Sequence, residues 1–518
     1  MNKNIVRLTN KVKRFKKWMV LVLSSIFLFL GCKESKQQKQ VKLFTSNCAG
    51  CHILPDINAL PRSMWEETLL PDMAARMGIK DNGYNPLKGV SYEEAEMIVK
   101  SGIYPAVPTI NQEDWELLKS YILELAPDSL ISREFPHNSK KMEQFKAVPV
   151  SLDDNPGNFM TYFEIKEDTL FMGDISGSLF TYHYGDQKPE LFKKVSSAVV
   201  DFDTYDQKSY ITAIGKLDPT DILSGQIFLL DGDDPVPSAD LFHRPVHNDV
   251  VDLNNDQQVE FVVSEFGNLT GQLSLIENPF GSNRKKTTLL AQPGTIKVEV
   301  VDLNKDNRLD IIALTSQGDE TITVLYQQED FTFIPEKVLR FSPIYGTSWF
   351  EVIDYDKDGD LDIVTVNGDN ADKTFIHKPY HGLRIHINDG ANHFEEKYFY
   401  PLNGATRFTS HDFDQDGDVD FGVISTFPDY EKYPDHSFVY LENTNSSAFE
   451  FSPTIIEQSM DSRWFLLDKG DIDSDGDIDI VLSSFTYVFT PVPKAITDLW
   501  QEKNVDLLVL ENNLRSKQ

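Results

Sequence analysis

The spacing of apolar side chains changes character near residue 127 of the chain. Between 41 and 126, apolar residues recur as they do on short helices, and Trp115, Leu118 and Ile122 fall on one helical face. Such spacing lets one side of each helix turn towards a shared core while the other side meets water. The pattern therefore predicts a small all-α domain in this part of the chain.

Beyond a polar linker, apolar and polar residues alternate as they do in β-strands, for example at Leu361 and Ile363. A repeat of about 50 residues built from short strands predicts an all-β propeller rather than a helical solenoid. We expect about seven blades, with six or eight as the alternatives, and a first blade near 159–184 that lacks the acidic phrase of the others. That phrase begins at Asp201, Asp252, Asp302, Asp354, Asp412 and Asp471, with separations of 51, 50, 52, 58 and 59 residues.

The first 32 residues have the pattern of an export signal. Basic residues precede an almost wholly apolar stretch from Trp18 to Leu30, which at thirteen residues is short for a membrane span. The stretch ends in Phe29-Leu30-Gly31-Cys32, which resembles a bacterial lipobox, although Phe29 and Leu30 depart from its commonest residues. The resemblance implies lipidation of Cys32 and a membrane anchor in the bacterial cell envelope, on the periplasmic face or the cell surface. Secretion with an unmodified thiol is the alternative.

These patterns predict a multidomain chain, and 518 residues are too many for one ordinary domain. We expect the signal peptide and lipobox at 1–32, a tether at 33–40, the helical domain at 41–127, a linker at 128–146 and the propeller at 147–514. The net charge of −32 argues against nucleic acid and anionic lipid surfaces as partners.

Only three cysteines occur, and two of them lie in Cys48-Ala49-Gly50-Cys51-His52, which is the C-x-x-C-H motif of covalent haem attachment. Two thiols three positions apart reach the two vinyl groups on one edge of a porphyrin, and the adjacent imidazole ligates the iron from below. A thioredoxin-like pair would need a βαβ context, and a zinc site would need a second pair of ligands that the chain lacks. The motif predicts one covalent haem c.

Around this motif, residues 41–127 resemble class I cytochrome c, in which the first and last helices cross beside the haem. Such domains usually supply a distal Met from the loop before the last helix, but the loop from Ile103 to Gln112 contains none. The phrase from Leu70 to Gly78 looks like the ligand segment of small cytochrome domains fused to propellers. That resemblance favours Met73 as the distal iron ligand, with Met77 second and an open iron position third.

The acidic phrase is clearest in Asp354-Tyr355-Asp356-Lys357-Asp358-Gly359-Asp360-Leu361-Asp362. Carboxylates at positions 1, 3, 5 and 9 with Gly at position 6 gather hard oxygen ligands around Ca²⁺, and position 7 adds a backbone carbonyl. An EF-hand would need Glu at position 12 and flanking helices, whereas strands follow here. The phrase therefore resembles the FG-GAP/VCBS repeat of integrin-type propellers. An Asx-rich turn that needs no metal is the alternative.

We predict three to five structural Ca²⁺ sites. A fifth loop, with Asp252, Asn254, Asp256 and Glu260, is weaker because Gln257 takes the turn position, and the copy at Asp201 and Asp203 has lost the pattern. In the fourth loop Asn307 replaces Gly, but Asn tolerates the left-handed conformation. The ligands predicted for the four better loops are Asp354, Asp356, Asp358, Asp360 and Asp362; Asp412, Asp414, Asp416, Asp418 and Asp420; Asp471, Asp473, Asp475, Asp477 and Asp479; and Asp302, Asn304, Asp306 and Asp310.

Three insertions follow the strand after an acidic loop, at 367–384, 427–436 and from 485 to Trp500. Equivalent positions in successive blades lie on one face of a propeller, so we expect a rim rich in Tyr, His and Asp that either binds a partner or only covers the propeller end. The order of lipobox, C-x-x-C-H and repeats, with phrases such as Tyr380-His381-Gly382 and Asn367-Gly368-Asp369-Asn370, resembles bacterial lipoproteins that fuse a cytochrome c domain to an FG-GAP/VCBS propeller.

The functional hypothesis with most support is single-electron transfer through the haem, with the propeller as a platform for a redox partner protein or another ligand. A calcium-dependent binding protein for glycans or surface partners is the alternative. A propeller-type polysaccharide-active enzyme is a third hypothesis, but the chain shows no nucleophile elbow, H-E-x-x-H or dinucleotide motif. The sequence thus favours an electron carrier over an enzyme.

Overall fold

The computed structural model describes residues 34–81, 83–131, 140–154, 159–186, 188–232, 234–370 and 375–514. The predicted signal peptide and Cys32 lie outside these residues. Within the described ranges, none of the helices is both long enough and apolar enough to cross a membrane.

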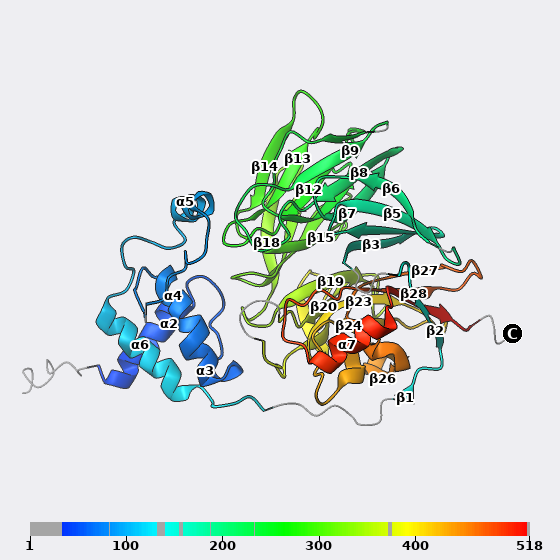
Figure 1. Ribbon diagram of the computed structural model, residues 1–518. Helices are drawn as coiled ribbons and strands as arrows, with labels where there is room; N and C mark the ends of the chain where they lie inside the picture. The colour runs from blue at the N-terminus through cyan, green and yellow to red at the C-terminus, as the bar shows by residue number, and fades with distance from the viewer. Residues whose placement is uncertain are drawn as a thin grey trace, which may run out of the picture.

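The helical part of the chain lies beside a large β structure (Figure 1). Its elements are α2 Lys36–Cys48, η1 Ile57–Ala59, α3 Arg62–Met64, η2 Trp65–Leu69, α4 Leu70–Arg76, α5 Tyr92–Ser101 and α6 Gln112–Leu125. Helices α2 and α6 pack against each other, and Phe44 and Trp115 are buried in the core between the elements. The predicted helical face of Trp115, Leu118 and Ile122 is confirmed, because all three side chains are buried. We call residues 34–126 the helical unit.

The described strands form seven sheets arranged as the blades of a propeller, which confirms the predicted propeller and its blade number. Blade 1 consists of β3 Met160–Lys166, β4 Thr169–Asp174, β5 Ser178–His183 and β6 Glu190–Lys194, and blade 2 of β7 Val199–Tyr205, β8 Lys208–Ala213, β9 Gln226–Leu230 and β10 Pro235–Pro237. Blade 3 consists of β11 Pro245–Val251, β12 Glu260–Glu265, β13 Gln272–Glu277 and β14 Lys285–Leu290, and blade 4 of β15 Thr295–Val301, β16 Asp310–Thr315, β17 Thr321–Gln327 and β18 Phe333–Arg340.

Blades 5 to 7 complete the ring. Blade 5 consists of β19 Thr347–Ile353, β20 Asp362–Asn367, β21 Gly382–Asn388 and β22 Phe394–Pro401, and blade 6 of β23 Ala405–His411, β24 Asp420–Ser425, β25 Phe438–Asn445 and β26 Glu450–Ile455, with β1 Lys140–Lys141 at its edge. Blade 7 consists of β27 Trp464–Gly470, β28 Asp479–Ser484, β29 Leu507–Asn512 and β2 Phe145–Val150. Short helices η3 Pro434–Ser437, η4 Ser446–Ala448, η5 Glu457–Met460 and α7 Lys494–Lys503 lie between strands of blades 6 and 7.

The N-terminal strand of the propeller closes the ring. β2 pairs antiparallel with β29, so the fourth strand of blade 7 comes from the start of the sheet region. Pairing begins at Phe145, two residues before the propeller start expected from the sequence. This closure joins the two ends of the propeller through main-chain hydrogen bonds and gives blade 7 its fourth, outer strand.

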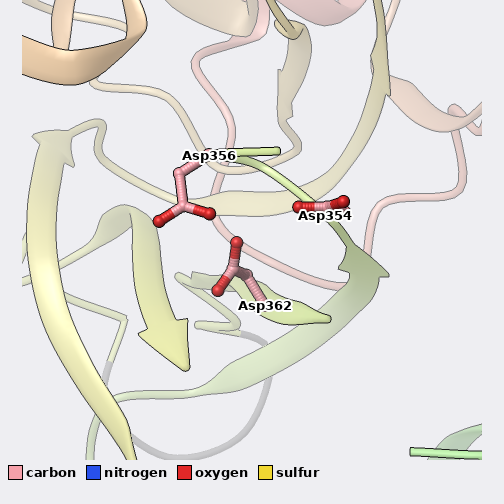
Figure 2. A group of neighbouring side chains, drawn as sticks. All are labelled: Asp354, Asp356 and Asp362. Atoms are coloured by element: carbon pink, nitrogen blue, oxygen red, sulfur yellow. The ribbon is translucent and has the colours of Figure 1, made fainter. Parts of the chain in front are cut away.

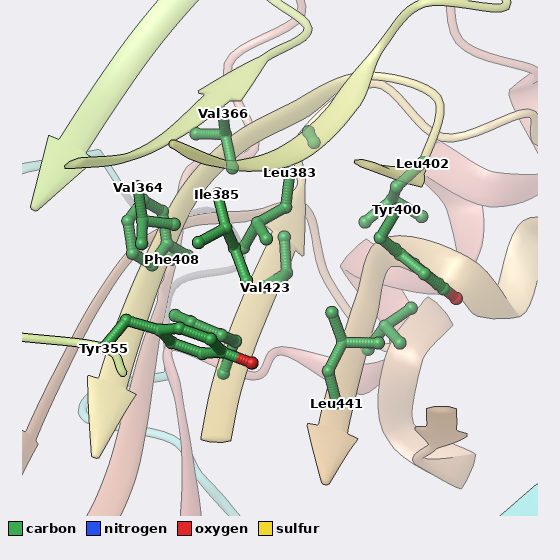
Figure 3. Close-up of a cluster of buried hydrophobic side chains, with 13 residues drawn as sticks. Tyr355, Val364, Val366, Leu383, Ile385, Tyr400, Leu402, Phe408, Val423 and Leu441 are labelled. Atoms are coloured by element: carbon green, nitrogen blue, oxygen red, sulfur yellow. The ribbon is translucent and has the colours of Figure 1, made fainter. Parts of the chain in front are cut away.

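The blades are held together by apolar clusters between neighbouring sheets. Between blades 5 and 6, buried side chains such as Ile385, Phe408 and Val423 come from three strands, with Tyr355 at one end of the cluster (Figure 3). The second strand of blade 5, β20, is buried along its whole length. Burial of a large apolar side chain contributes about 1.5–3 kcal/mol, so these contacts stabilise each blade against the next.

The degenerate copy of the acidic phrase at Asp201 lies within a strand instead of a loop. Asp201 and Asp203 lie inside β7, and the connection from β7 to β8 is the two-residue turn Asp206-Gln207, with φ of 44° and 64°. Two consecutive residues with positive φ are typical of a tight hairpin turn. Blade 2 therefore has no acidic loop between its first two strands, which agrees with the loss of the pattern in this copy.

Candidate functional site

Five nine-residue loops join the first and second strands of blades 3 to 7, and they share one backbone conformation. Positions 4 and 6 have positive φ in every loop, at Asn255 and Gln257, Lys305 and Asn307, Lys357 and Gly359, Gln415 and Gly417, and Ser474 and Gly476. The turn at position 6 was predicted from glycine, and it survives with Asn or Gln. The left-handed residue at position 4 was not predicted, because no single residue type marks it.

Position 2 of each loop is apolar and anchors the loop in the core. Leu253, Leu303, Tyr355, Phe413 and Ile472 are each no more than 4% exposed. The buried position-2 side chain therefore fixes where the backbone of each loop leaves the core. This anchor gives the five loops a common shape before any ligand binds.

Position 9 fastens each loop to its blade. The Asp362 carboxylate accepts hydrogen bonds from the Tyr355 amide at 2.9 Å and from the Asn388 amide at 2.8 Å. Asp420 and Asp479 accept the equivalent pairs of amides. Burial raises the pKa of Asp362 to about 6 and those of Asp420 and Asp479 to about 7. A cation nearby would favour the charged carboxylates that burial disfavours.

In three loops the position-1 carboxylate has an unsatisfied oxygen. The Oδ1 atoms of Asp354, Asp412 and Asp471 are buried and have no hydrogen-bond partner among the described residues. Each of these aspartates belongs to a group of three that offer ligand oxygens within 4.8 Å of one another. The groups are Asp354, Asp356 and Asp362 (Figure 2); Asp412, Asp414 and Asp416; and Asp471, Asp473 and Asp479. Converging oxygens with an unmet acceptor fit a hard cation such as Ca²⁺.

The two remaining loops satisfy their position-1 carboxylates internally. The Asp302 oxygens accept the amides of Asp306 at 3.0 Å and Asn307 at 2.8 Å. The Asp252 oxygens accept the amides of Asp256 at 3.1 Å and Gln257 at 2.9 Å. Neither loop forms a group of three carboxylates in the described part of the chain, and in both loops position 3 is Asn instead of Asp. Three loops therefore combine converging carboxylates with an unmet oxygen, while in these two the position-1 carboxylate is satisfied as in an Asx-type turn.

In the loops of blades 5 and 6, the position-7 carboxylates contact lysines of the preceding loop. Lys305, at position 4 of one loop, lies 2.5 Å from the Asp360 carboxylate in the next blade. Lys357, at the same position one blade later, lies 3.6 Å from Asp418 and donates to the Gly417 carbonyl. Asp360 and Asp418 were predicted as ligands, but the structure places their carboxylates against the preceding loop. We call these contacts the lysine ladder.

The C-x-x-C-H motif begins at the last residue of α2. Cys48 is half-buried against the core of the helical unit, Cys51 is exposed, and neither forms a disulfide. Burial raises the pKa of the Cys48 thiol to about 12, whereas the reactive thiol of a redox-active pair has a lowered pKa. Cys48, Cys51 and His52 also do not form a three-ligand group within 4.8 Å in the described region, which argues against a zinc site.

The His52 ring is oriented by its own backbone. Its Nδ1 lies 2.7 Å from the Ile53 carbonyl, and only a protonated Nδ1 can donate there. This hydrogen bond selects the tautomer in which Nε2 carries the lone pair. A metal-binding histidine is commonly oriented by such a bond from its second nitrogen, so His52 fits the role of proximal iron ligand.

Met73 lies in α4 and Met77 at its C-terminal end, four positions apart. Both are half-buried against the core that contains Cys48, so each stays a candidate distal ligand. The fully buried indole N–H of Trp115 in this core has no acceptor among the described residues. A buried donor without an acceptor fits a core completed by a group that carries carboxylates, as haem does.

The three insertions join the second and third strands of blades 5, 6 and 7, at 368–381, 426–437 and 485–506, and so they share one face. The acidic loops join first and second strands and lie on the opposite face. The helical unit occupies part of the insertion face, because Tyr380 donates to the Ala59 carbonyl at 3.1 Å and Ile376 packs against the helical core. This docking was not expected from the sequence.

A family model for FG-GAP-like repeats matches residues 302–365, which include the loops at Asp302 and Asp354. The predicted FG-GAP repeat is thus confirmed over this segment. The resemblances to cytochrome c and to lipoproteins stay predictions. No curated protein matches the chain in sequence.

Three solved structures are similar to the chain at low identity. YCF48 bound to D1 peptide has a TM-score of 0.43 and 7% identity, and the match covers 72% of this chain and 98% of that chain. BBS1N in complex with ARL6DN, soaked with mercury, has a TM-score of 0.42 and 10% identity over 71% and 97% of the two chains. The N-terminal domain of Nup159 has a TM-score of 0.37 and 13% identity over 72% and 96%.

Proposed function

We propose that this protein is an exported, lipid-anchored electron carrier of the bacterial envelope, with one c-type haem on the helical unit and a calcium-stabilised propeller as its binding platform. The observation that carries the proposal is the C-x-x-C-H motif at the end of α2, with the tautomer of His52 fixed by the Ile53 carbonyl. The propeller with FG-GAP-like repeats supplies a large rigid surface beside that motif.

Each residue of the motif has a distinct role. Cys48 and Cys51 would hold the porphyrin through thioether bonds, and His52 would bind the iron on the proximal side. Met73 or Met77 would complete the iron coordination from the same core. Bound haem supplies reversible one-electron oxidation and reduction, and the electron comes from or goes to a redox partner protein.

The calcium ions have a structural role in this proposal. Support comes from Asp354, Asp412 and Asp471, each of which holds a buried oxygen with no hydrogen-bond partner among the described residues. Three Ca²⁺ ions would also offset part of the net charge of −32. They lie on the face opposite the helical unit, so they would stabilise the platform without taking part in electron transfer.

The test is to produce the full chain in an envelope that attaches haem to C-x-x-C-H proteins. We expect intact mass to increase by one haem, the visible spectrum to be that of six-coordinate iron, and voltammetry to give a reversible one-electron wave. The Cys48→Ala/Cys51→Ala chain is the matched control and should lack all three signals. Unmodified cysteines in the wild type would contradict the proposal, as would five-coordinate haem with peroxidase turnover.

A second candidate function is calcium-dependent binding of glycans or surface partners. Exposed aromatic side chains on the insertion face favour it, among them Phe159 and Tyr487. Their ring centroids lie 6.4 Å apart, and the side chains are 38% and 52% exposed. Such rings can stack on sugar rings. Retention on immobilised polysaccharide that is lost with a chelator would support this function, whereas no retention across a broad glycan panel would reject it.

A further inference from the structure

The segment that follows the haem motif rests on the propeller. Ala59 is the last residue of η1, seven positions after His52, and its carbonyl accepts the Tyr380 hydroxyl at 3.1 Å. Ile344, from the connection into blade 5, and Ile376, from the insertion between β20 and β21 of that blade, pack against the core of the helical unit. A polar contact and an apolar contact therefore join blade 5 to the segment beside the motif.

Tyr380 is itself held rigidly. Its ring stacks on Tyr345, with centroids 4.7 Å apart and planes inclined by 17°. Its carbonyl accepts Arg384 Nη2 at 2.8 Å, and Arg384 Nη1 donates to Asn367 at 2.6 Å. Asn367 ends β20, so two consecutive hydrogen bonds from the blade, together with the stacking on Tyr345, position Tyr380. Burial raises the pKa of Tyr380, which keeps the hydroxyl a donor at neutral pH.

A second anchor lies across the same face, on blade 2. The amide of Asp221 donates to the Glu94 carboxylate on α5 at 2.7 Å. Asp221 is fully buried, and its own carboxylate accepts the amides of Leu269 at 2.9 Å and Thr270 at 2.6 Å. Two separated anchors fix the orientation of the helical unit as well as its distance, which one contact could not do.

We infer that Tyr380 is a positioning residue for the haem-bearing segment: blade 5 clamps Ile57–Ala59 and so sets the orientation and the solvent access of the proximal side at His52. This inference rests on the proposed function and deepens it. The helical unit is then a fixed part of the platform, and a redox partner meets the haem in one orientation relative to the propeller.

The first test measures docking and needs no haem. Hydrogen exchange of residues 53–65 is compared in the full chain carrying Cys48→Ala/Cys51→Ala, with and without Tyr380→Phe. A hydrogen bond worth about 1 kcal/mol net predicts roughly fivefold faster exchange when the hydroxyl is removed. Tyr380→Ala, which also removes the stacking on Tyr345, should exceed that effect. The control is Tyr487→Phe on the blade 7 insertion, which should leave exchange unchanged.

The second test uses the haem-loaded chain. Looser docking admits water, which stabilises the more highly charged oxidised iron, so Tyr380→Phe should lower the midpoint potential relative to wild type and Tyr487→Phe. Unchanged exchange overturns the inference, and so does faster exchange with an unchanged potential. A wild-type spectrum without haem overturns the proposed function first and this inference with it, which distinguishes the two failures.

Discussion

At the scale of single residues, position 1 distinguishes the acidic loops that fit a metal from those whose carboxylate is already satisfied. Among the described residues, Oδ1 of Asp471 is buried without a hydrogen-bond partner, while both oxygens of Asp252 accept amides. The sequence marks the same division: the loops at Asp354, Asp412 and Asp471 have Asp at position 3 and Gly at position 6, whereas those at Asp252 and Asp302 have Asn at position 3 and Gln or Asn at position 6. The residue types therefore indicate which loops fit Ca²⁺, but the unmet Oδ1 is visible only in the structure.

We expect Asp471→Asn to remove one Ca²⁺ from the binding stoichiometry, because a neutral amide replaces a charged ligand whose oxygen has no other partner. If the substitution reduces the binding free energy of that site by about 1.4 kcal/mol or more, its affinity for Ca²⁺ falls at least tenfold. Calorimetric titration of the decalcified chain measures both quantities. Asp252→Asn is the matched control and should leave the stoichiometry unchanged; equal losses in the two variants would show that the unmet oxygen does not mark the site.

The choice between Met73 and Met77 as distal iron ligand also depends on single residues. They lie on one side of α4 and its end, and both contact the core near Cys48. The sequence resemblance favours Met73, and nothing in the packing separates the two.

We expect Met73→Ala to abolish the signature of methionine-ligated ferric haem and to lower the potential, since thioether ligation raises it. Met77→Ala should retain the signature. Visible and Raman spectra of the two haem-loaded variants measure this. The reverse result would make Met77 the ligand, and an unchanged spectrum in both variants would point to another sixth ligand.

At the scale of elements, the period near 50 residues identified the blades because each acidic loop has a strand on either side. The ring closure by β2 could not be predicted from the sequence. Ala147 pairs with Leu510, and no local pattern indicates a contact between residues so far apart in the chain. The tight turn at Asp206 was not predicted either. The sequence showed that the copy at Asp201 has lost the loop pattern, but not that its aspartates lie within a strand.

The lysine ladder leads to a prediction about these elements. Lys357→Met removes the charge beside Asp418 in the next loop while retaining the aliphatic stem. We expect the calcium-free protein to become less stable by less than about 1 kcal/mol, because this pair is largely exposed. We also expect calcium to stabilise the variant more than wild type, because the neighbouring carboxylates lose a competing cation.

Thermal unfolding with and without calcium, at low and high salt, measures this effect. Salt should diminish the difference between variant and wild type, since it screens exposed charges. Lys397→Met, which breaks an exposed pair with Glu395 away from the loops, is the control. A variant whose calcium-free stability equals that of wild type at low salt would show that the ladder carries no energy.

At the scale of the whole molecule, carboxylates on the first strands link consecutive blades around the ring. Asp468 of blade 7 accepts the Ile165 amide of blade 1 at 2.7 Å, and Asp201 of blade 2 accepts the Asn248 amide of blade 3 at 2.6 Å. No sequence pattern distinguishes Asp468 from the other aspartates of the chain. Its importance comes from a position between blades that are far apart in the chain.

These buried carboxylates predict how stability depends on pH. Burial raises the pKa values of Asp201 and Asp468 to about 7, against about 3.9 in an unfolded chain. Between these values the folded state binds more protons than the unfolded state, so stability is greatest at the acidic end and falls as pH rises towards 7. Urea unfolding of the calcium-saturated chain at pH 5.5 and 8 should therefore give the lower midpoint at pH 8. Asp468→Asn keeps an acceptor for Ile165 but cannot ionise, so its midpoint should change less; an equal change in both chains would place the pH dependence elsewhere.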